Sequence, residues 1–272
     1  MNYYKICITA PEKEQDVIIA LLDANGYEGF EQDKFGLKTY QQEANFDEHI
    51  LKELAVELEF TYKLKVIPNQ NWNALWESRF QPIKIDNFCG IRADFHPAHT
   101  DVKHEIIIQP KMAFGTGHHE TTFMMMSAME KIPFANKKVL DYGCGTGILA
   151  ILATKLDADT VQAIDFDPLS YENTLENIEK NQSENIRTLL GELDKINDND
   201  FDVILANINR SVIIATLPRL FSKLNLNGIT LISGILQTDE TLVTAHIKKA
   251  GFVVLDIHAK GEWLCMKLQK QG

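Results

Sequence analysis

Cysteine is scarce in this chain, and no two cysteines stand close together. Only four of the 272 residues are cysteines, spread between Cys7 and Cys265, and none forms a Cys-x-x-Cys pair. This spacing is not typical of a disulfide-stapled fold or a zinc ribbon, so we expect reduced thiols. The adjacent His118 and His119 point apart and have no ligand at suitable spacing, so we expect no metal site.

Long apolar runs are also missing. No stretch approaches the roughly 20 apolar residues of a membrane helix, and no basic and apolar signal segment opens the sequence. We therefore expect a soluble, cytoplasmic protein that does not contact membranes. With 272 residues, 45% of them hydrophobic, the chain can form one large domain or two unequal ones.

Basic residues are fewer than acidic ones: the chain has 27 Lys and Arg and 38 Asp and Glu, which gives a net charge of −11. This balance argues against a protein that grips nucleic acid by electrostatics, so no direct nucleic-acid contact is expected. Residues 1–67 hold seven Lys, no Arg and thirteen acidic residues, a net charge of −6. Such a module suits a basic protein partner, although an ordinary solvated acidic surface explains the charge equally well.

The first 67 residues predict a small α+β domain. Strand-like alternation over residues 3–9 precedes a helical pattern over residues 12–24 that Asn25-Gly26 ends. Two short strands, a helix near residues 46–58 and a strand over residues 60–67 complete a βαββαβ order, typical of a ferredoxin-like sandwich. Residues 68–85 are interpreted as a linker, in which Trp72, Trp76 and Phe80 share one stripe of a short helix.

Residues 86–272 predict a doubly wound α/β domain. A hairpin over residues 88–95 and 105–109 leads into strands at 138–141, 161–165, 201–206 and 228–233, which alternate with helices at 148–156, 170–181 and 211–220. A last helix over residues 238–250 precedes two paired strands, at 252–258 and 263–269. A reversed final hairpin is typical of class I methyltransferases.

The most informative motif is the turn Asp141-Tyr142-Gly143-Cys144-Gly145-Thr146-Gly147 between a strand and a helix. Alternating glycines allow a backbone to approach a ligand closely. The next strand ends at Asp165, where a carboxylate can accept both hydroxyls of a ribose. A dinucleotide site would need its third glycine at Ile148, so the pattern favours S-adenosylmethionine, with Asp141 placed to help hold its ammonium.

Two further segments are candidates for the site. The loop 112–122 holds two glycines and several small polar residues just before a helix, so it could cover the cofactor, with Phe114 as an apolar wall and Thr122 as a polar contact. The strand 201–206 ends at Ala206-Asn207-Ile208, where aminomethylating enzymes place an Asn or Asp. We expect Asn207 to accept from the target amine; a simple strand cap is the alternative.

These motifs, in this order, resemble the PrmA family, which methylates protein eleven of the large ribosomal subunit. The resemblance runs from the N-terminal module through Met112-Ala113-Phe114-Gly115-Thr116-Gly117, the glycine turn, Ala206-Asn207-Ile208 and Ser233-Gly234-Ile235-Leu236 to Gly261-Glu262-Trp263. It implies a Rossmann-like domain that methylates lysine side chains and the N-terminal amine, and an N-terminal module that binds the ribosomal protein. It also implies that S-adenosylmethionine contacts fall on Thr122, Gly143, Asp165 and Asn207, with Asn207 catalytic.

One loop departs from the family pattern. Many members read Asp-Pro-Gly and Thr-His-Pro where this chain has Gln109-Pro110-Lys111 and His118-His119-Glu120, so contacts of those positions are not carried over. A methyltransferase for RNA or for a small molecule, and a cofactor-binding assembly factor without turnover, remain alternatives. We expect a monomer.

Overall fold

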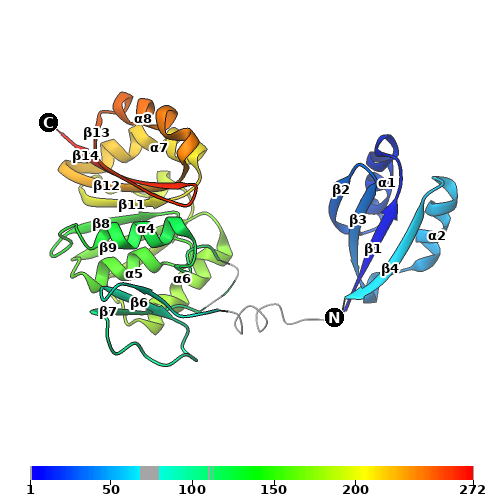
Figure 1. Cartoon of the computed structure of the whole chain (residues 1–272), viewed down its shortest axis with the longest axis horizontal. Coiled ribbons are helices and arrows are strands. Elements are labelled where there is room, and N and C mark those ends of the chain that lie inside the picture. The colour runs from blue at the N-terminus through cyan, green and yellow to red at the C-terminus, as the bar shows by residue number, and fades with distance from the viewer. Residues whose placement is uncertain (1, 68–79, 110, 112, 272) are drawn as a thin grey trace. The chain divides into compact units, whose positions relative to one another are not determined.

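The computed structural model of the protein describes residues 2–67, 80–109, 111 and 113–271 (Figure 1). Residues 71–79 of the short aromatic helix expected before Phe80 lie outside the described residues. The chain divides into two compact units, Met1–Leu75 and Trp76–Gly272. The boundaries expected from the sequence, 1–67, 68–85 and 86–272, stay a prediction.

The N-terminal unit is a four-stranded antiparallel sheet with helices on one face. Its elements are β1 (Tyr3–Thr9), α1 (Glu12–Ala24), β2 (Glu28–Asp33), β3 (Gly36–Gln42), the 3-10 turn η1 (Glu43–Asn45), α2 (Glu48–Glu57) and β4 (Thr61–Ile67). The strand order is β2-β3-β1-β4, as in a ferredoxin-like sandwich. Alternate residues of β1, Ile6 and Ile8, are buried against Ile18 of α1 and Leu51 of α2.

The C-terminal unit contains a seven-stranded sheet in the order β10-β9-β8-β11-β12-β14-β13. Its elements are α4 (Glu120–Met129), β8 (Lys138–Tyr142), α5 (Ile148–Lys155), β9 (Thr160–Asp165), α6 (Pro168–Lys180), β10 (Ile186–Leu190), η2 (Leu193–Lys195), β11 (Phe201–Asn207), α7 (Arg210–Lys223), β12 (Leu224–Leu236), η3 (Gln237–Asp239), α8 (Glu240–Lys249), β13 (Phe252–Lys260) and β14 (Trp263–Lys270). Strand β14 runs antiparallel to both of its neighbours. The doubly wound order and the reversed last hairpin are confirmed.

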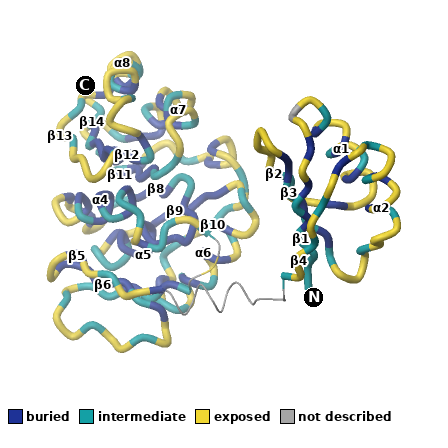
Figure 2. Tube along the Cα trace, turned by 45° about the vertical axis from the view of Figure 1, so that its right-hand side comes forward, coloured by how far each residue is buried: buried dark blue, intermediate teal, exposed yellow. Residues whose placement is uncertain are grey.

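Two apolar layers sandwich this sheet, which explains why its central strands are apolar on both sides. Val139 packs with the layer that α4 and α5 form, whereas the next residue, Leu140, packs with the layer that α7 and α8 form. Figure 2 shows the resulting buried strands at the centre of this unit. Helix α6 covers the same face as α5 through Ile178. Among the described residues, no helix is long and apolar enough to span a membrane.

Two expectations about strands were wrong. The lead-in segments form β6 (Cys89–Arg92) and β7 (His104–Ile107), which pair in parallel; the antiparallel partner of β6 is β5 (Ile83–Ile85), which lies inside the expected linker. Strand β10 was not expected at all. It is a short edge strand in which no residue is buried. Its sequence therefore lacks the apolar run that marks the central strands.

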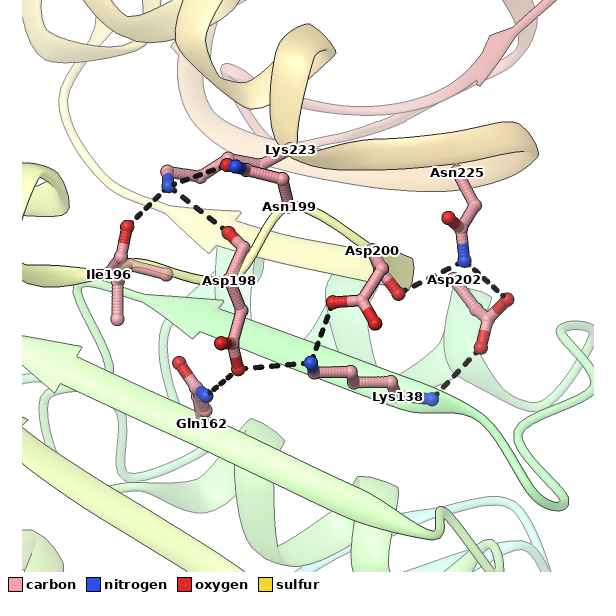
Figure 3. Close-up of polar contacts among 9 residues, drawn as sticks. All are labelled: Lys138, Gln162, Ile196, Asp198, Asn199, Asp200, Asp202, Lys223 and Asn225. Atoms are coloured by element: carbon pink, nitrogen blue, oxygen red, sulfur yellow. Dashed lines mark hydrogen bonds and ion pairs between the residues drawn. The ribbon is translucent and has the colours of Figure 1, made fainter.

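Acidic residues just before β11 form ion pairs and hydrogen bonds at the amino ends of β8 and β11 (Figure 3). The Lys138 ammonium pairs with Asp198 at 3.0 Å and Asp200 at 2.6 Å. The buried Lys223 ammonium donates to the carbonyl oxygens of Ile196 and Asp198. Buried donors and acceptors are stable only when paired, so these contacts fasten the β10–β11 connection to the sheet.

Candidate active site

A cavity of about 1240 Å³ opens at the carboxyl edge of the parallel strands, the usual place for ligands in this architecture. Its walls come from the ends of β8, β9, β10 and β11, from the segment 113–121, from α7 and from the start of β14. The lining residues include Phe114, His119, Thr121, Tyr142, Gly143, Gly145, Asp165, Gly191, Glu192, Asn207, Ile208, Val212, Gly234 and Trp263.

The glycine turn adopts left-handed backbone angles, as its sequence predicts. Gly143, Gly145 and Gly147 have φ values of 73°, 56° and 78°. A Cβ on Gly145 would lie 2.3 Å from the Phe114 carbonyl oxygen, and one on Gly143 would lie 2.2 Å from the Ile208 Cγ2. Glycine is therefore needed at these positions because the segments that contain Phe114 and Ile208 pack against the turn. The sequence had suggested that the glycines make room for a ligand.

The loop before α4 is bound to this turn. Thr146 donates from its backbone N–H to the Phe114 carbonyl oxygen at 2.9 Å and from its hydroxyl to the Gly115 carbonyl oxygen at 2.6 Å. The Phe114 side chain is half exposed and lines the cavity. This arrangement matches the expected apolar wall over the site.

Asp165 is held rigidly on the cavity wall at the end of β9. Its Oδ2 accepts the Gly145 N–H at 2.9 Å, and its Oδ1 accepts the Asp167 N–H at 3.0 Å. Only 8% of the residue is exposed. Since a carboxylate has about four lone-pair sites, two hydrogen bonds leave acceptor capacity on both oxygens for a ligand.

Asp141 has a different place from the one expected. It does not line the cavity; it is 1% exposed, and its Oδ2 accepts the Ala150 N–H in the first turn of α5 at 3.0 Å. Its Oδ1 has no hydrogen-bond partner among the described residues. Burial raises the pKa of this carboxyl to about 7, aided by the charge of Asp165 and opposed by the Ala150 bond. Direct contact with a ligand ammonium is therefore not its role in this geometry.

Asn207 ends β11 and lines the cavity. Its Nδ2 donates to the Thr122 Oγ1 at 3.2 Å, whereas its Oδ1 is buried without a partner among the described residues. Thr122 itself is fully buried and lies behind Asn207, off the cavity wall. The hydrogen bond to Thr122 orients the Asn207 amide, and a ligand donor that reached its oxygen would remove the cost of an unpaired buried acceptor.

The rings of His119 and Trp263 join Phe114 on the cavity wall, which was not expected from the sequence. The His119 ring lies 5.2 Å from Phe114 and 5.0 Å from Trp263, centroid to centroid. His119 also caps α4, because its Nδ1 accepts the Thr121 N–H. Trp263 had appeared only within the family motif Gly261-Glu262-Trp263. Within the described part of the chain, no group of His, Cys, Asp or Glu could hold a metal ion.

The cavity suits S-adenosylmethionine. Asp165 offers carboxylate acceptors to ribose hydroxyls, and the unpaired Asn207 oxygen suits a donor or a positive charge. The strand order, the reversed β14 and the glycine turn at the carboxyl edge define a class I S-adenosylmethionine-dependent methyltransferase. Across residues 6–271 the chain matches the family model described as "Ribosomal protein L11 methyltransferase (PrmA)", and it belongs to that family.

Relatives named ribosomal protein L11 methyltransferase resemble the chain over almost its full length. The protein of Porphyromonas gingivalis is 37% identical over 94% of this chain and 91% of its own length. That of Phocaeicola vulgatus is 36% identical over 98% of this chain and 99% of its own. The crystal structure of the ribosomal protein L11 methylase from Lactobacillus delbrueckii subsp. bulgaricus has 28% identity and a TM-score of 0.65, covering 71% of this chain and 100% of that one.

The raised pKa of Asp141 predicts how stability changes with pH. An unfolded Asp has a pKa of about 3.9, and the folded value is about 7. Between these values the folded state keeps a proton that the unfolded state has released, so this group lowers the free energy of unfolding as pH rises from about 4 to about 7. Asp141→Asn keeps an acceptor for Ala150 and should lose this decline.

Urea unfolding without cofactor, at about pH 5 and about pH 8, measures this effect as the difference between variant and wild type. Asp159→Asn removes an exposed carboxylate and should follow wild type at both pH values. An Asp141→Asn protein that loses as much stability as wild type between the two pH values would contradict the assignment.

Proposed function

We propose that this chain is a cytoplasmic enzyme that transfers methyl groups from S-adenosylmethionine to amines of ribosomal protein L11, namely lysine side chains and the N-terminal amine. The observation that carries the proposal is Asn207, which lines the cavity and whose buried side-chain oxygen lacks a partner among the described residues. The names of the full-length relatives support the substrate.

Gly143, Asp165 and Asn207 are the proposed cofactor contacts. When bound, S-adenosylmethionine supplies an electrophilic methyl group on a sulfonium. Asp165 would bind the ribose, since both of its oxygens keep acceptor capacity after their backbone bonds. Gly143 lines the cavity next to it. Thr122 would act through Asn207, whose amide it orients.

The proposed reaction needs a neutral amine, because a lysine ammonium has a reference pKa near 10.4 and no lone pair to attack with. The Asn207 oxygen can accept an amine N–H and aim the lone pair without adding a negative charge that would favour the ammonium. The rings of Phe114, His119 and Trp263 lie together on the cavity wall, where they would displace water from around a bound amine. Positioning and desolvation therefore supply most of the rate.

The N-terminal unit is the proposed recognition module for the ribosomal protein. Its net charge of −6 over residues 1–67 favours a basic partner by electrostatic steering. All described lining residues of the cavity belong to the other unit, so recognition and chemistry are divided between them. The proposed enzyme is a monomer.

Mass spectrometry of purified L11 after incubation with the enzyme and S-adenosylmethionine tests the proposed activity. We expect mass increments of whole methyl groups on lysines and on the N-terminus. Ribosomal RNA is tested as the alternative acceptor, and a reaction without an acceptor is the control. Methylation of RNA but not of L11, or binding of cofactor without release of S-adenosylhomocysteine, would contradict the proposal.

Removing the Asp165 carboxylate should weaken cofactor binding. Asp165→Ala deletes charge-assisted hydrogen bonds, each of which contributes about 1.5 to 3 kcal/mol, equivalent to roughly 10- to 150-fold in affinity. Calorimetric titration with S-adenosylmethionine measures the loss. Asp194→Ala, at an acidic residue that does not line the cavity, is the control and should bind normally. Unchanged affinity in Asp165→Ala would contradict the proposal that Asp165 binds the ribose.

Asn207 should matter more for turnover than for cofactor affinity. Asn207→Ala removes the aiming acceptor and should lower kcat by about a hundredfold, the scale of orientation effects. Asn207→Asp adds a charge that holds the amine protonated, so its rate should fall at neutral pH and recover in part as pH rises.

Steady-state methylation of L11 across pH checks this role. Thr122→Val removes the hydroxyl that orients the amide and should fall between wild type and Asn207→Ala. Turnover near that of wild type in Asn207→Ala would show that Asn207 does not position the amine and only caps the strand. A pH profile of Asn207→Asp parallel to wild type would also contradict the role.

A further inference from the structure

The charges of the N-terminal unit are separated between its two faces. Helices α1 and α2 cover one face of the sheet, and their residues pack on Ile6, Ile8 and Leu37. The other face carries the alternate residues of β1, β3 and β4. We call it the open sheet face, and its central residues are Tyr3, Lys5, Cys7, Lys38, Tyr40, Lys63 and Lys65.

Strand register places the lysines of the open sheet face side by side. Lys5 of β1 lies directly opposite Lys65 of β4, and Cys7 lies between Lys63 of β4 and Lys38 of β3. Four of the seven lysines in residues 1–67 therefore share this face. The acidic residues opposite β3 are Glu28, Glu31 and Asp33 of the edge strand β2, one fewer than the four lysines. The open face is thus positive in a module whose total charge is −6.

Most of this positive charge is not neutralised within the unit. Lys38 pairs with Glu31 at 3.1 Å. Among the ion pairs of the described residues, none includes Lys5, Lys63 or Lys65. Like charges directly opposite each other destabilise an antiparallel pair, as Lys5 and Lys65 do here. A bound anion would relieve this repulsion.

Aromatic rings stand among these lysines. Tyr40 lies directly opposite Lys5, whose ammonium is 5.6 Å from the centre of the ring. Tyr3 is two residues along β1 from Lys5 and therefore lies on the same face. Both tyrosines are partly exposed, and Figure 2 shows β1, β3 and β4 side by side.

We infer that the open sheet face binds single-stranded RNA. Lysines recognise phosphates, while aromatic side chains stack on unpaired bases, and a four-stranded sheet with such residues on its central strands is a known platform for both. An acidic protein would use the lysines but not the rings. The choice of RNA over DNA rests on the proposed ribosomal substrate. Net charge had argued against nucleic acid because it averages over the two faces.

Fluorescence anisotropy of the full chain with a labelled oligouridine of about 12 nucleotides tests this inference without any methyl donor. The double variant Lys63→Glu/Lys65→Glu should bind at least tenfold more weakly, with the slope of log affinity against log salt reduced by about 1.4, or 0.7 for each lost phosphate contact. Lys13→Glu/Lys52→Glu makes the same charge change on α1 and α2, at lysines of 82% and 62% side-chain exposure, and should change affinity less than twofold.

Tyr40→Ala separates stacking from charge. It should weaken oligouridine binding about tenfold and leave the salt slope unchanged, because no phosphate contact is lost. Lys63→Gln/Lys65→Gln repeats the charge test with a milder change if the glutamate variant does not fold, as judged by circular dichroism.

Four outcomes would overturn the inference. These are absence of RNA binding at about 50 mM salt, equal losses in the sheet and helix variants, equal affinity for polyglutamate, and equal affinity for oligodeoxythymidine. The polyglutamate result would assign the face to acidic proteins. Because binding is measured without turnover, each outcome is independent of whether L11 is methylated.

Discussion

The close backbone approach at the glycine turn is the constraint on which the site depends. The Phe114 carbonyl oxygen occupies almost the place where a Gly145 side chain would begin. Two buried carboxylates then secure the turn and the helix that follows: Asp165 accepts the Gly145 N–H, and Asp141 accepts the Ala150 N–H. A side chain at Gly145 would push away the loop that forms one wall of the cavity.

The two acids near this turn illustrate how environment separates roles. Asp165 stands at the cavity with acceptor capacity to spare, whereas Asp141 is buried beneath the turn and titrates near neutrality. The Asp141 carboxylate therefore stabilises the strand-turn-helix unit through its bond to Ala150. A similar division holds between Asn207, which faces the cavity, and Thr122, which holds its amide from behind.

The N-terminal unit shows why total charge is a poor guide to partners. Its helices and turns carry most of the acidic residues, while strand alternation collects lysines and tyrosines on the open sheet face. One small module can therefore present surfaces of opposite sign. An acidic surface favours a basic partner, and a basic one favours an anionic partner such as a nucleic acid.

The sequence by itself determined what depends on local order. Periodicity predicted the βαββαβ module and the doubly wound series, and strand ends placed Gly143, Asp165 and Asn207 at one edge, because parallel strands bring their carboxyl ends together. Only the tertiary structure decided the parallel pairing of β6 with β7, the existence of β10, the burial of Asp141 and the bond between Thr122 and Asn207. These features depend on strand register and on contacts between residues up to 85 positions apart, which no local pattern encodes.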